Sequence, residues 1–328
     1  MMHHTKFGTT DMSISRVGFG SWAMSGPNSP SYWGPQEDNT SVATIRRGIE
    51  LGINWIDTAA IYGMGHAERI VAEAISVYSD ADRPLVFTKG GLAWDKAAPD
   101  ATVTKCGKRE SILAEADASL RRLGVDRIDL YQMHWPANDA EVQEYWSAFG
   151  ELLQSGKVRA IGLSNHSVEQ LEAAAQIAPV HAIQVPLSLV NTAAADSLLV
   201  WAAEHGAGTL LYSPMASGLL TGKYRGGDLG ALDDNDWRRR SPLFTPENLA
   251  RVDQLVDVLA EIAAAKSTTV SAVAVAWTLT RPGATAAIVG ARTPEQVNDW
   301  IDAGTLTFED AELAALDRAQ AQYASAQS

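Results

Sequence analysis

The stretch "NWIDTAAIYGMGHAERIVAEAI", from Asn54 to Ile75, contains a complete strand-to-helix unit and two side chains unusual for a buried segment. Its apolar start ends on the carboxylate of Asp57, and Tyr62 follows in a glycine-punctuated turn before a helical pattern begins. Binding and catalytic residues of parallel α/β barrels gather where the strands end. The stretch therefore predicts a buried strand with functional groups at its exit.

The same alternation of short apolar segments and helical patterns runs through the whole chain. The predicted strands are 15–21, 54–59, 84–90, 128–135, 158–165, 181–188, 208–214 and 285–291. Each is apolar on both faces, as a strand of a buried parallel sheet should be. Helical spacing of apolar residues over 111–124, 168–178 and 195–206 fills some of the intervals, and Gly124 and Gly206 supply stop signals.

Eight such units predict a (β/α)₈ TIM barrel, formed by residues 1–328 as a single domain. A doubly wound sheet is the alternative, but Gly18, Gly20 and Gly26 do not have the G-x-G-x-x-G spacing of its phosphate turn. Residues 5–15 look like a hairpin that closes the N-terminal mouth of the barrel. Residues 222–246 form a long polar loop after the seventh strand, and loops of that length are usually functional.

Composition restricts the partners. The formal net charge is −13 and the pI is about 4.9, which disfavours nucleic acid because phosphate backbones are repelled. An anionic ligand would need a local basic cluster, and "WRRR" at Trp237 to Arg240 is one candidate. We expect a small-molecule substrate and a monomer.

The use of cysteine and the length of the apolar runs indicate the cellular compartment. Cys106 is the single cysteine, so no intrachain disulfide forms, which is typical of a reducing compartment. No signal peptide is visible, and the run 270–279 is half of the roughly 20 residues that a membrane helix needs. We read His3 and His4 as incidental, predict no metal site, and expect a cytoplasmic protein with no membrane partner.

Four titratable residues follow three consecutive strands: Asp57 and Tyr62 after the second, Lys89 at the third and His134 at the fourth. Singly, each has a plain structural explanation, as a helix cap, a core phenol, a snorkelling lysine or a satisfied histidine. Together they suit acid–base chemistry, because a buried lysine needs a carboxylate and a phenol beside an ammonium has its pKa lowered toward neutrality. Tyr62 would then be a general acid for a carbonyl oxygen, with His134 as a second donor.

At these motifs the chain resembles the aldo-keto reductases, over nearly its whole length. The supporting stretches, in the family's order, are "GINWIDTAAIYGMGHAE", "TKG", "DLYQMHWP", "GKVRAIGLSN", "LLYSPMASGLLTGKY" and "VGARTPEQV". The resemblance is to bacterial NADPH-dependent members of the general-stress type. It implies that Asp57, Tyr62, Lys89 and His134 are the catalytic tetrad, with Tyr62 as acid or base.

The resemblance also implies NADPH/NADP⁺ as cofactor. Its carboxamide would be held by Ser164, Asn165 and Gln184, and its ring would stack on Tyr212. Arg292 matches the residue that grips the 2′-phosphate, for which a guanidinium fork is suited. The remaining expected cofactor contacts are Trp22, Asp57, Ser213, Pro214, Met215, Gly218, Leu219, Lys223, Arg238, Gly290 and Gln296. Arg238 would close over the pyrophosphate, although a run of arginines is often only a solvated face.

The chain departs from the family's pattern at four positions. Trp300 stands where many relatives carry an adenine-reading Asn, so that adenine stacks on the indole or Trp300 only packs. Leu187 and Ser188 replace a frequent Tyr-Asn pair, and His166 replaces a common Phe. None of these positions belongs to the tetrad.

Aromatic residues are expected to wall the substrate pocket: Trp22, Tyr32, Trp33 and Trp135. Such walls suit apolar aldehydes and the C–H faces of sugars. The leading hypothesis is an NADPH-dependent aldehyde or ketone reductase. The alternatives are an NADP-dependent aldose 1-dehydrogenase and a non-catalytic, redox-sensing binding subunit of the kind that some family members form.

Overall fold

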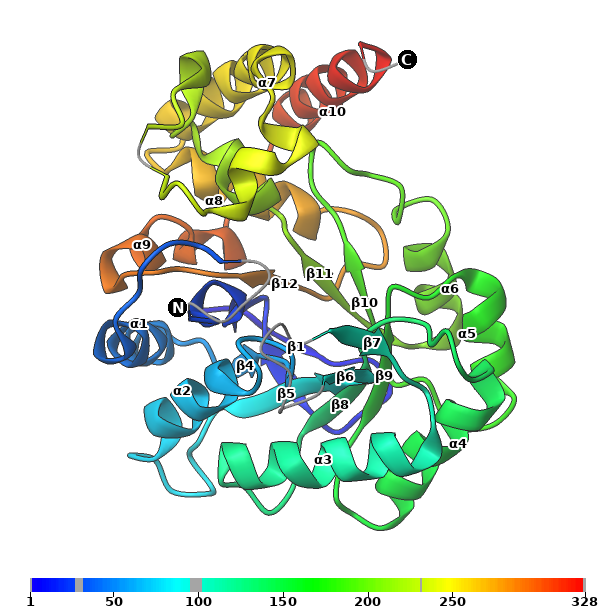
Figure 1. The fold of residues 1–328 in the computed structure, drawn as a ribbon. Coiled ribbons are helices and arrows are strands. Elements are labelled where there is room, and N and C mark those ends of the chain that lie inside the picture. The colour runs from blue at the N-terminus through cyan, green and yellow to red at the C-terminus, as the bar shows by residue number, and fades with distance from the viewer. Residues whose placement is uncertain (1, 27–31, 95–101, 231, 327–328) are drawn as a thin grey trace.

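The computed structural model describes residues 2–26, 32–94, 102–230 and 232–326, and eight parallel strands close into a barrel at its centre (Figure 1). The strands are β3 (Val17–Gly20), β4 (Trp55–Asp57), β5 (Leu85–Gly90), β8 (Leu130–Met133), β9 (Ile161–Ser164), β10 (Ala182–Pro186), β11 (Gly208–Tyr212) and β12 (Ala286–Val289). They follow sequence order around the barrel, and β12 pairs with β3 to close it. Each strand lies inside a predicted segment, so the predicted barrel is confirmed.

Helices surround the barrel and cover the outer faces of its strands (Figure 1). They are α1 (Asp38–Glu50), α2 (His66–Ile75), α3 (Arg109–Leu123), α4 (Val142–Gln154), α5 (Val168–Ala175), α6 (Leu198–His205), α7 (Pro246–Ala265), α8 (Val270–Leu279), α9 (Pro294–Asn298) and α10 (Asp310–Ser325). Gly124 and Gly206 cap α3 and α6 with φ of 66° and 67°. Both predicted stop signals are therefore confirmed, because a left-handed residue ends the helix where only glycine fits easily.

The N-terminal hairpin closes the barrel from the end opposite the predicted site. Its strands β1 (His4–Lys6) and β2 (Ser13–Ser15) are antiparallel, and the turn between them carries Phe7, which is fully buried. The ring of Phe7 stacks on Phe87 at 5.4 Å, and Phe87 in turn contacts Trp55 at 5.1 Å. Apolar side chains thus fill the lower interior of the barrel, and the predicted plug is confirmed.

Several elements have no counterpart among the sequence-based expectations. After β5 the chain forms an antiparallel pair, β6 (Leu92–Trp94) and β7 (Val103–Lys105). Short 3₁₀ turns are η1 (Trp22–Met24), η2 (Ala216–Thr221), η3 (Arg225–Gly227), η4 (Trp237–Arg240), η5 (Pro242–Phe244) and η6 (Ile301–Gly304). The long loop predicted after the seventh strand is thus built from η3, η4 and η5.

A second hydrophobic cluster lies beside the barrel, among α7, α8, α10 and the turns that follow β11. Figure 1 shows these helices grouped together at the top of the view. Leu220, Leu259 and Val273 are fully buried in this cluster. Residues of the long loop are buried in this cluster. The loop, which forms one wall of the barrel's mouth, is therefore supported by a hydrophobic core separate from that of the barrel.

Within the described ranges, no single helix has the length and apolar character to cross a membrane. By length and composition only the pair α7 and α8 would qualify together, and its two helices are bent by 98°.

Candidate functional site

A layer of polar side chains occupies the barrel interior at the carboxyl ends of the strands. Lys89 on β5 pairs in register with Gln132 on β8, and Ser164 on β9 pairs with Gln184 on β10. Side chains at paired positions of neighbouring strands point to the same face, because side chains alternate with a period of two. Each pair therefore faces one side of the sheet, and hydrogen bonds from Gln184 to Gln132 and to Asp57 of β4 join the two pairs in one layer.

Asp57 and Lys89 form a buried ion pair at the centre of this layer. The Nζ of Lys89 lies 2.5 Å from Oδ1 of Asp57, and the two side chains are 0% and 4% exposed. Nζ also donates to the carbonyl of Thr58 at 2.9 Å and to the hydroxyl of Tyr62 at 3.5 Å. Burial lowers the pKa of Lys89, while Asp57 works in the opposite direction. All three Nζ donors are thus engaged, which a buried ammonium requires.

Tyr62 accepts from Lys89, so its own proton remains available for donation. The prediction that its pKa falls toward neutrality was wrong for this arrangement. Burial raises the pKa of Tyr62 well above its usual value, and the charge of Asp57 adds to the rise. The ammonium does not counter this, because its charge is already paired with Asp57 at closer range. Tyr62 is therefore a protonated phenol at neutral pH, the form that a general acid needs.

His134 lies across from Tyr62, with ring centroids 5.8 Å apart and the rings nearly perpendicular. Burial lowers the pKa of His134 well below its usual value, and Lys89 lowers it further. The imidazole is therefore neutral. Its Nδ1 is buried and has no hydrogen-bond partner among the residues that the structure describes. A neutral imidazole beside the phenol can donate one hydrogen bond to the same substrate oxygen.

Gln184 is held by Asp57 on one side of its amide. Its Nε2 donates to Oδ2 of Asp57 at 2.8 Å and to Oε1 of Gln132 at 3.2 Å. Because a carboxylate only accepts, this contact orients the amide and leaves Oε1 of Gln184 for a ligand. Gln132 was missed by the sequence analysis, although an inward-facing glutamine in the buried strand "DLYQM" was a usable signal.

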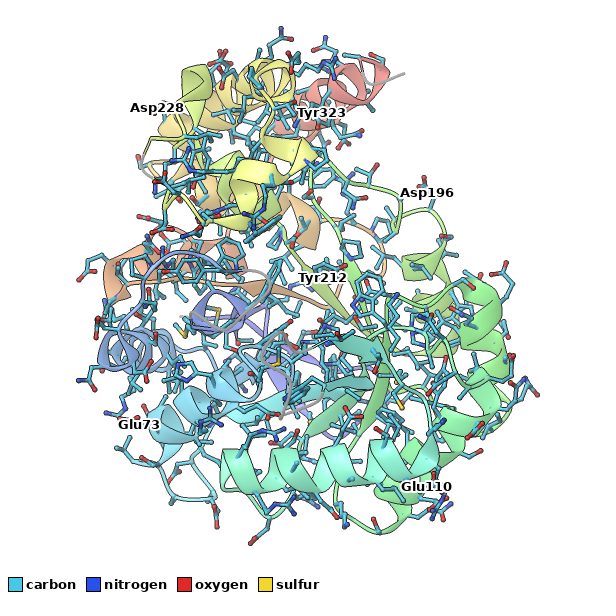
Figure 2. The ribbon with its side chains drawn as sticks, viewed as in Figure 1. Glu73, Glu110, Asp196, Tyr212, Asp228 and Tyr323 are labelled. Atoms are coloured by element: carbon cyan, nitrogen blue, oxygen red, sulfur yellow. The ribbon has the colours of Figure 1, made fainter. Side chains whose placement is uncertain are left out.

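Asn165 joins three strand ends. Its Nδ2 donates to the carbonyl of His134 and to the hydroxyl of Ser164, both at 3.0 Å, and its Oδ1 accepts from the hydroxyl of Tyr212 at 2.8 Å. The residue has a φ of 64°, which asparagine tolerates better than most side chains. Burial raises the pKa of Tyr212 to about 12, with Tyr62 adding to the rise. Asn165 therefore fixes the aromatic ring of Tyr212 at the end of β11, near the centre of the molecule (Figure 2).

A large cleft opens above this layer, with a volume of about 1260 Å³. That exceeds the roughly 300–1,000 Å³ of ordinary small-molecule pockets and leaves room for a dinucleotide with a substrate. The predicted site residues that line it are Trp22, Trp33, Asp57, Tyr62, His134, Trp135, Ser164, Asn165, Gln184, Tyr212, Ser213, Pro214, Met215, Gly218, Lys223, Arg238, Gly290, Arg292 and Gln296. Lys89 lies beneath the lining, paired with Asp57.

Two predicted contacts do not line the cleft. The side chain of Leu219 is buried in the second hydrophobic cluster. Tyr32 stands outside the lining, and its carbonyl accepts from the backbone N–H of Trp237 at 3.2 Å. The lining includes residues that the sequence analysis did not name, among them Gln36, Leu92, Val103 and Tyr224. Their positions depend on how loops far apart in sequence meet, and no local pattern signals that.

Three tryptophans cluster at one side of the cleft. Trp22 lies 5.1 Å from Trp33 and 5.6 Å from Trp237, and Trp33 lies 5.5 Å from Trp237, centroid to centroid. Trp22 also approaches the ring of Tyr62 at 6.4 Å. Trp135 is 37% exposed and carries Lys105 over its ring at 4.7 Å. The part of the cleft next to Tyr62 is therefore aromatic.

The turn after β11 has an unusual backbone. Ser213, Ala216 and Ser217 have φ of 56°, 47° and 59°, and Gly218 has 94°. Non-glycine residues in this region are uncommon and persist where the surrounding structure holds them. Where a turn passes from right-handed to left-handed backbone, its successive N–H groups form a concave surface that binds anions. The turn lies on the cleft wall where the phosphates of a dinucleotide were expected.

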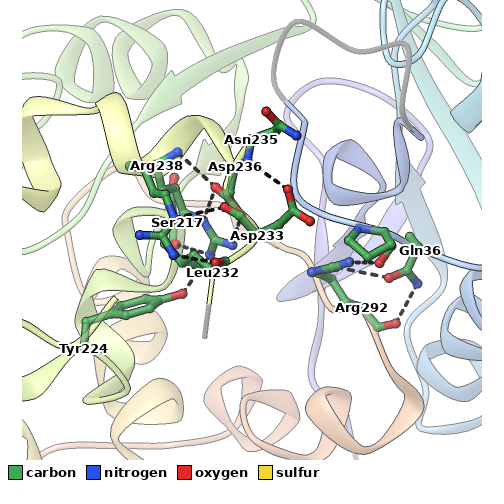
Figure 3. Close-up of polar contacts among 11 residues, drawn as sticks. Gln36, Ser217, Tyr224, Leu232, Asp233, Asn235, Asp236, Arg238 and Arg292 are labelled. Carbon is green, nitrogen blue, oxygen red and sulfur yellow. Dashed lines mark hydrogen bonds and ion pairs between the residues drawn. The ribbon is translucent and has the colours of Figure 1, made fainter. Parts of the chain in front are cut away.

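Arg238 is tied to its own loop by an internal carboxylate. Its Nε and Nη2 donate to Asp236 at 2.9 and 2.6 Å, and its Nη1 donates to the hydroxyl of Tyr224 at 3.0 Å (Figure 3). The guanidinium also stacks over Trp33 at 4.6 Å. Burial works to raise the pKa of Asp236, but the hydrogen bonds from Arg238 outweigh it and hold the pKa below its usual value. Arg238 is only 7% exposed, so it is not part of a solvated charge run.

All four departures from the family's pattern are buried, with Leu187 at 0% and Ser188 at 3% exposed. Trp300 is 2% exposed and packs against Phe19 at 6.4 Å, and it also contributes to the cleft lining. His166 is 3% exposed, with Nδ1 2.8 Å from the carbonyl of Ser164 and Nε2 2.8 Å from the hydroxyl of Tyr145. Because the carbonyl only accepts, Nδ1 carries the proton and the hydroxyl of Tyr145 donates to Nε2. Burial lowers the pKa of His166 to about 4.

Comparisons with known proteins find relatives by family model, by sequence and by structure. The family model described as "Aldo/keto reductase family" matches residues 16–321. "Aldo-keto reductase YhdN" of Bacillus subtilis is 38% identical over 94% of this chain and 91% of its own length. The "NADH-specific methylglyoxal reductase" of Escherichia coli is 32% identical over 95% and 96%. A solved glycerol dehydrogenase from Gluconobacter oxydans superposes with a TM-score of 0.88, at 34% identity, over 98% of this chain and 95% of that one.

Proposed function

Because the chain belongs to the aldo/keto reductase family, we propose that it is an NADPH-dependent reductase of small aldehydes and ketones with Tyr62 as proton donor. The family consists of oxidoreductases that use a nicotinamide cofactor. The observation that carries the proposal is the buried chain from Asp57 through Lys89 to Tyr62. It ends on a phenol in the wall of an aromatic cleft, with the phenolic proton unused by Lys89.

The proton chemistry follows from these contacts. Tyr62 donates its proton to the carbonyl oxygen of the substrate, and the resulting phenolate is stabilised by the Nζ of Lys89, already in contact at 3.5 Å. Neutral His134 donates a hydrogen bond to the same oxygen and orients it. When bound, the nicotinamide supplies the hydride. In the reverse direction Tyr62 takes the proton back from an alcohol.

The cleft fits such a cofactor in charge as well as in size. The protein carries a net charge of −13, yet Lys223, Arg238 and Arg292 all line the cleft. We assign the pyrophosphate to Lys223, Arg238 and the turn after β11, and the 2′-phosphate to Arg292. The carboxamide would bind Oε1 of Gln184 with Ser164 and Asn165, and the ring would stack on Tyr212. The other proposed contacts are Trp22, Asp57, Ser213, Pro214, Met215, Gly218, Leu219 through its backbone, Gly290 and Gln296.

The aromatic wall indicates the class of substrate. Trp22, Trp33 and Trp135 offer flat apolar faces beside Tyr62. Such faces hold apolar carbonyl compounds and the C–H faces of polyols with little loss of entropy. A small, uncharged aldehyde or ketone is the substrate that this wall suits best.

The oxidative direction is the second candidate. It is favoured by the solved glycerol dehydrogenase, which superposes over 98% of this chain. The same residues serve both directions, because the acid of the reduction is the base of the oxidation. An NADP-dependent dehydrogenase of aldoses or related polyols is therefore the alternative.

The decisive experiment is Tyr62→Phe, which removes the phenolic proton and leaves the ring. We expect kcat for NADPH oxidation with a panel of small aldehydes to fall by about 10²- to 10⁴-fold, the usual contribution of a general acid. The Kd for NADPH should stay unchanged, because Tyr62 is assigned no cofactor contact. Tyr78→Phe, at a half-buried tyrosine away from the cleft, is the matched control. Activity in Tyr62→Phe equal to that of the parent would disprove the assignment.

The direction is tested on the parent protein by measuring NADP⁺ reduction with aldoses and with glycerol. Faster turnover there than in the aldehyde panel would favour the dehydrogenase. Tight cofactor binding without turnover in either direction would favour the non-catalytic binding subunit. The expected monomeric state and cytoplasmic location stay predictions.

A further inference from the structure

The cofactor cleft is bordered by loop 1, defined here as residues 32–37, between the first barrel strand and α1. Loop 1 lies next to Arg292, which follows β12, and Figure 3 shows Gln36 directly beside the Arg292 guanidinium. Residues 36 and 292 are 256 positions apart in sequence. Their contact is therefore a product of the fold, and it involves the cation to which we assign the 2′-phosphate.

The side chain of Gln36 contacts both the side chain and the backbone of Arg292. The Nε of Arg292 donates to Oε1 of Gln36 at 3.1 Å, and Nε2 of Gln36 donates to the carbonyl of Arg292 at 2.8 Å. Nε2 of Gln36 also donates to the hydroxyl of Ser41 in α1, at 3.1 Å. The Nη2 of Arg292 donates to the carbonyl of Pro35. Loop 1 thus supplies two neutral oxygens to the Nε–Nη2 edge of the guanidinium.

That edge is one of the pairs of parallel N–H groups with which an arginine grips a phosphate. Nη1, the nitrogen outside this edge, is also approached by loop 1: a Cβ built on Gly34 would lie 3.5 Å from it. A 2′-phosphate that engages Arg292 by its Nε–Nη2 edge must therefore displace Pro35 and Gln36. A dinucleotide without that phosphate leaves the contacts intact.

We propose that loop 1 competes with the 2′-phosphate of the cofactor for Arg292, and that Gln36 sets the selectivity between phosphorylated and unphosphorylated dinucleotides. The inference rests on the proposed function through the assignment of Arg292 to the 2′-phosphate. The competition weakens the binding of NADP(H) and leaves the binding of NAD(H) unchanged. Gln36 acts through Arg292 and is a specificity-determining residue without a place in the proton chemistry.

The experiment measures binding without the nicotinamide. Isothermal calorimetry on the full chain gives the Kd of adenosine 2′,5′-bisphosphate and of AMP, which differ only by the 2′-phosphate. Gln36→Ala should tighten the bisphosphate about threefold to tenfold, the equivalent of one neutral hydrogen bond no longer displaced, and leave AMP unchanged. Gln36→Glu should weaken the bisphosphate about tenfold, because a carboxylate competes more strongly for the guanidinium and repels the phosphate.

Ser41→Ala is the matched control. It removes one hydrogen bond of Gln36 without touching Arg292, and both Kd values should stay those of the parent. An unchanged ratio of the two Kd values in Gln36→Ala would overturn the proposal. So would weaker bisphosphate binding in that variant, which would mean that Gln36 positions Arg292 for the phosphate.

Arg292→Ala separates this inference from the assignment on which it rests. If the variant binds both probes with equal Kd values while Gln36→Ala changes nothing, the competition is overturned and the 2′-phosphate assignment stands. If Arg292→Ala leaves the parent's ratio intact, the assignment fails and the competition fails with it. Opposite shifts in Gln36→Ala and Gln36→Glu, the first of them abolished in an Arg292→Ala background, support the proposal.

Discussion

At the scale of single residues, the site depends on which hydrogen-bonding groups are already occupied. Lys89 uses its three donors on Asp57, Thr58 and Tyr62, and Gln184 presents its amide nitrogen to Asp57. What remains for ligands includes the phenolic proton of Tyr62, the carbonyl oxygen of Gln184 and the unpartnered ring nitrogen of His134. The identities of these side chains were predictable from the sequence. Which of their atoms stay available to bind a ligand was not.

His166 shows how a single substitution changes the dependence of stability on pH. Burial lowers its pKa from an ordinary 6.5 to about 4, so between these values the unfolded chain binds a proton that the folded chain does not. Stability then falls as the pH falls through this range, by up to about 3 kcal/mol for this residue. Above pH 6.5 the imidazole is neutral in both states and contributes no pH dependence.

We therefore expect His166→Phe to be less stable than the parent at pH 7, because the carbonyl of Ser164 and the hydroxyl of Tyr145 lose their partner. The difference in free energy of unfolding should shrink by up to about 3 kcal/mol between pH 6.5 and 4. Urea denaturation at a series of pH values measures it. Tyr145→Phe is the control, since it removes the hydrogen bond between Tyr145 and His166 and keeps the imidazole. If the difference in free energy of unfolding between His166→Phe and the parent is constant with pH, the lowered pKa of His166 is contradicted.

At the scale of elements, the N-terminal hairpin packs so tightly against the barrel that it leaves no space for an added side-chain atom at Gly208. A Cβ built on Gly208, at the start of β11, would lie 2.5 Å from the ring of Phe7, far inside van der Waals contact. Phe7 is fully buried and stacked on Phe87, so its ring has no room to yield. The hairpin therefore closes the barrel only because β11 begins with a residue that has no side chain.

Gly208→Ala is expected to destabilise the protein by about 1–3 kcal/mol, the usual cost of overpacking. Combining it with Phe7→Leu should cost less than the sum of the two single changes, because the smaller side chain relieves the clash. Denaturant titration gives the three values. Gly150→Ala is the control: it lies inside α4, where a Cβ meets only Ala178 at 3.5 Å, and it should stabilise by up to about 1 kcal/mol. Additive losses in the double variant would disprove the clash.

The elements that sequence patterns missed share a physical cause. The β6–β7 pair and the 3₁₀ turns after β11 are short and carry no apolar periodicity of their own. The turns after β11 are held by single apolar side chains, such as Leu220 and Phe244, that enter the second hydrophobic cluster, and by bonds between loops such as that from Trp237 to Tyr32. Periodicity reports several apolar residues that repeat along one face, so a short turn that buries one or two side chains leaves no such signal.

At the scale of the whole molecule, many carboxylates are exposed on the outer surface, while Lys223, Arg238 and Arg292 line the cleft. Glu73, Glu110, Asp196 and Asp228 are exposed and lie around the periphery in Figure 2. The cleft is lined both by residues of the barrel strands and by Tyr224, which belongs to the second hydrophobic cluster. A ligand in the cleft therefore links the barrel to that cluster.

Saturation with NADP⁺ should raise the thermal stability of the whole chain at once. At about a hundred times its Kd, the ligand adds about 2.7 kcal/mol to the free energy of unfolding, or about 4 °C in Tm for a chain of this length. Differential scanning calorimetry should show one transition, shifted as a unit, which also tests the prediction that 1–328 is a single domain. Duplex DNA should cause no shift. Two transitions, of which only one moves, would contradict both the linkage and the single domain.

The amino-acid sequence by itself determined the order of strands and helices, the closed barrel, and the residue types at the strand ends. These follow from local periodicity and from stop signals such as Gly124, which act over a few residues. The tertiary structure alone decided the direction of the pKa shift of Tyr62, the orientation of the Gln184 amide and the partners of Arg238 and Arg292. Each depends on burial and on contacts between distant segments, as between Gln36 and Arg292, and no local pattern encodes which of two competing partners a donor meets.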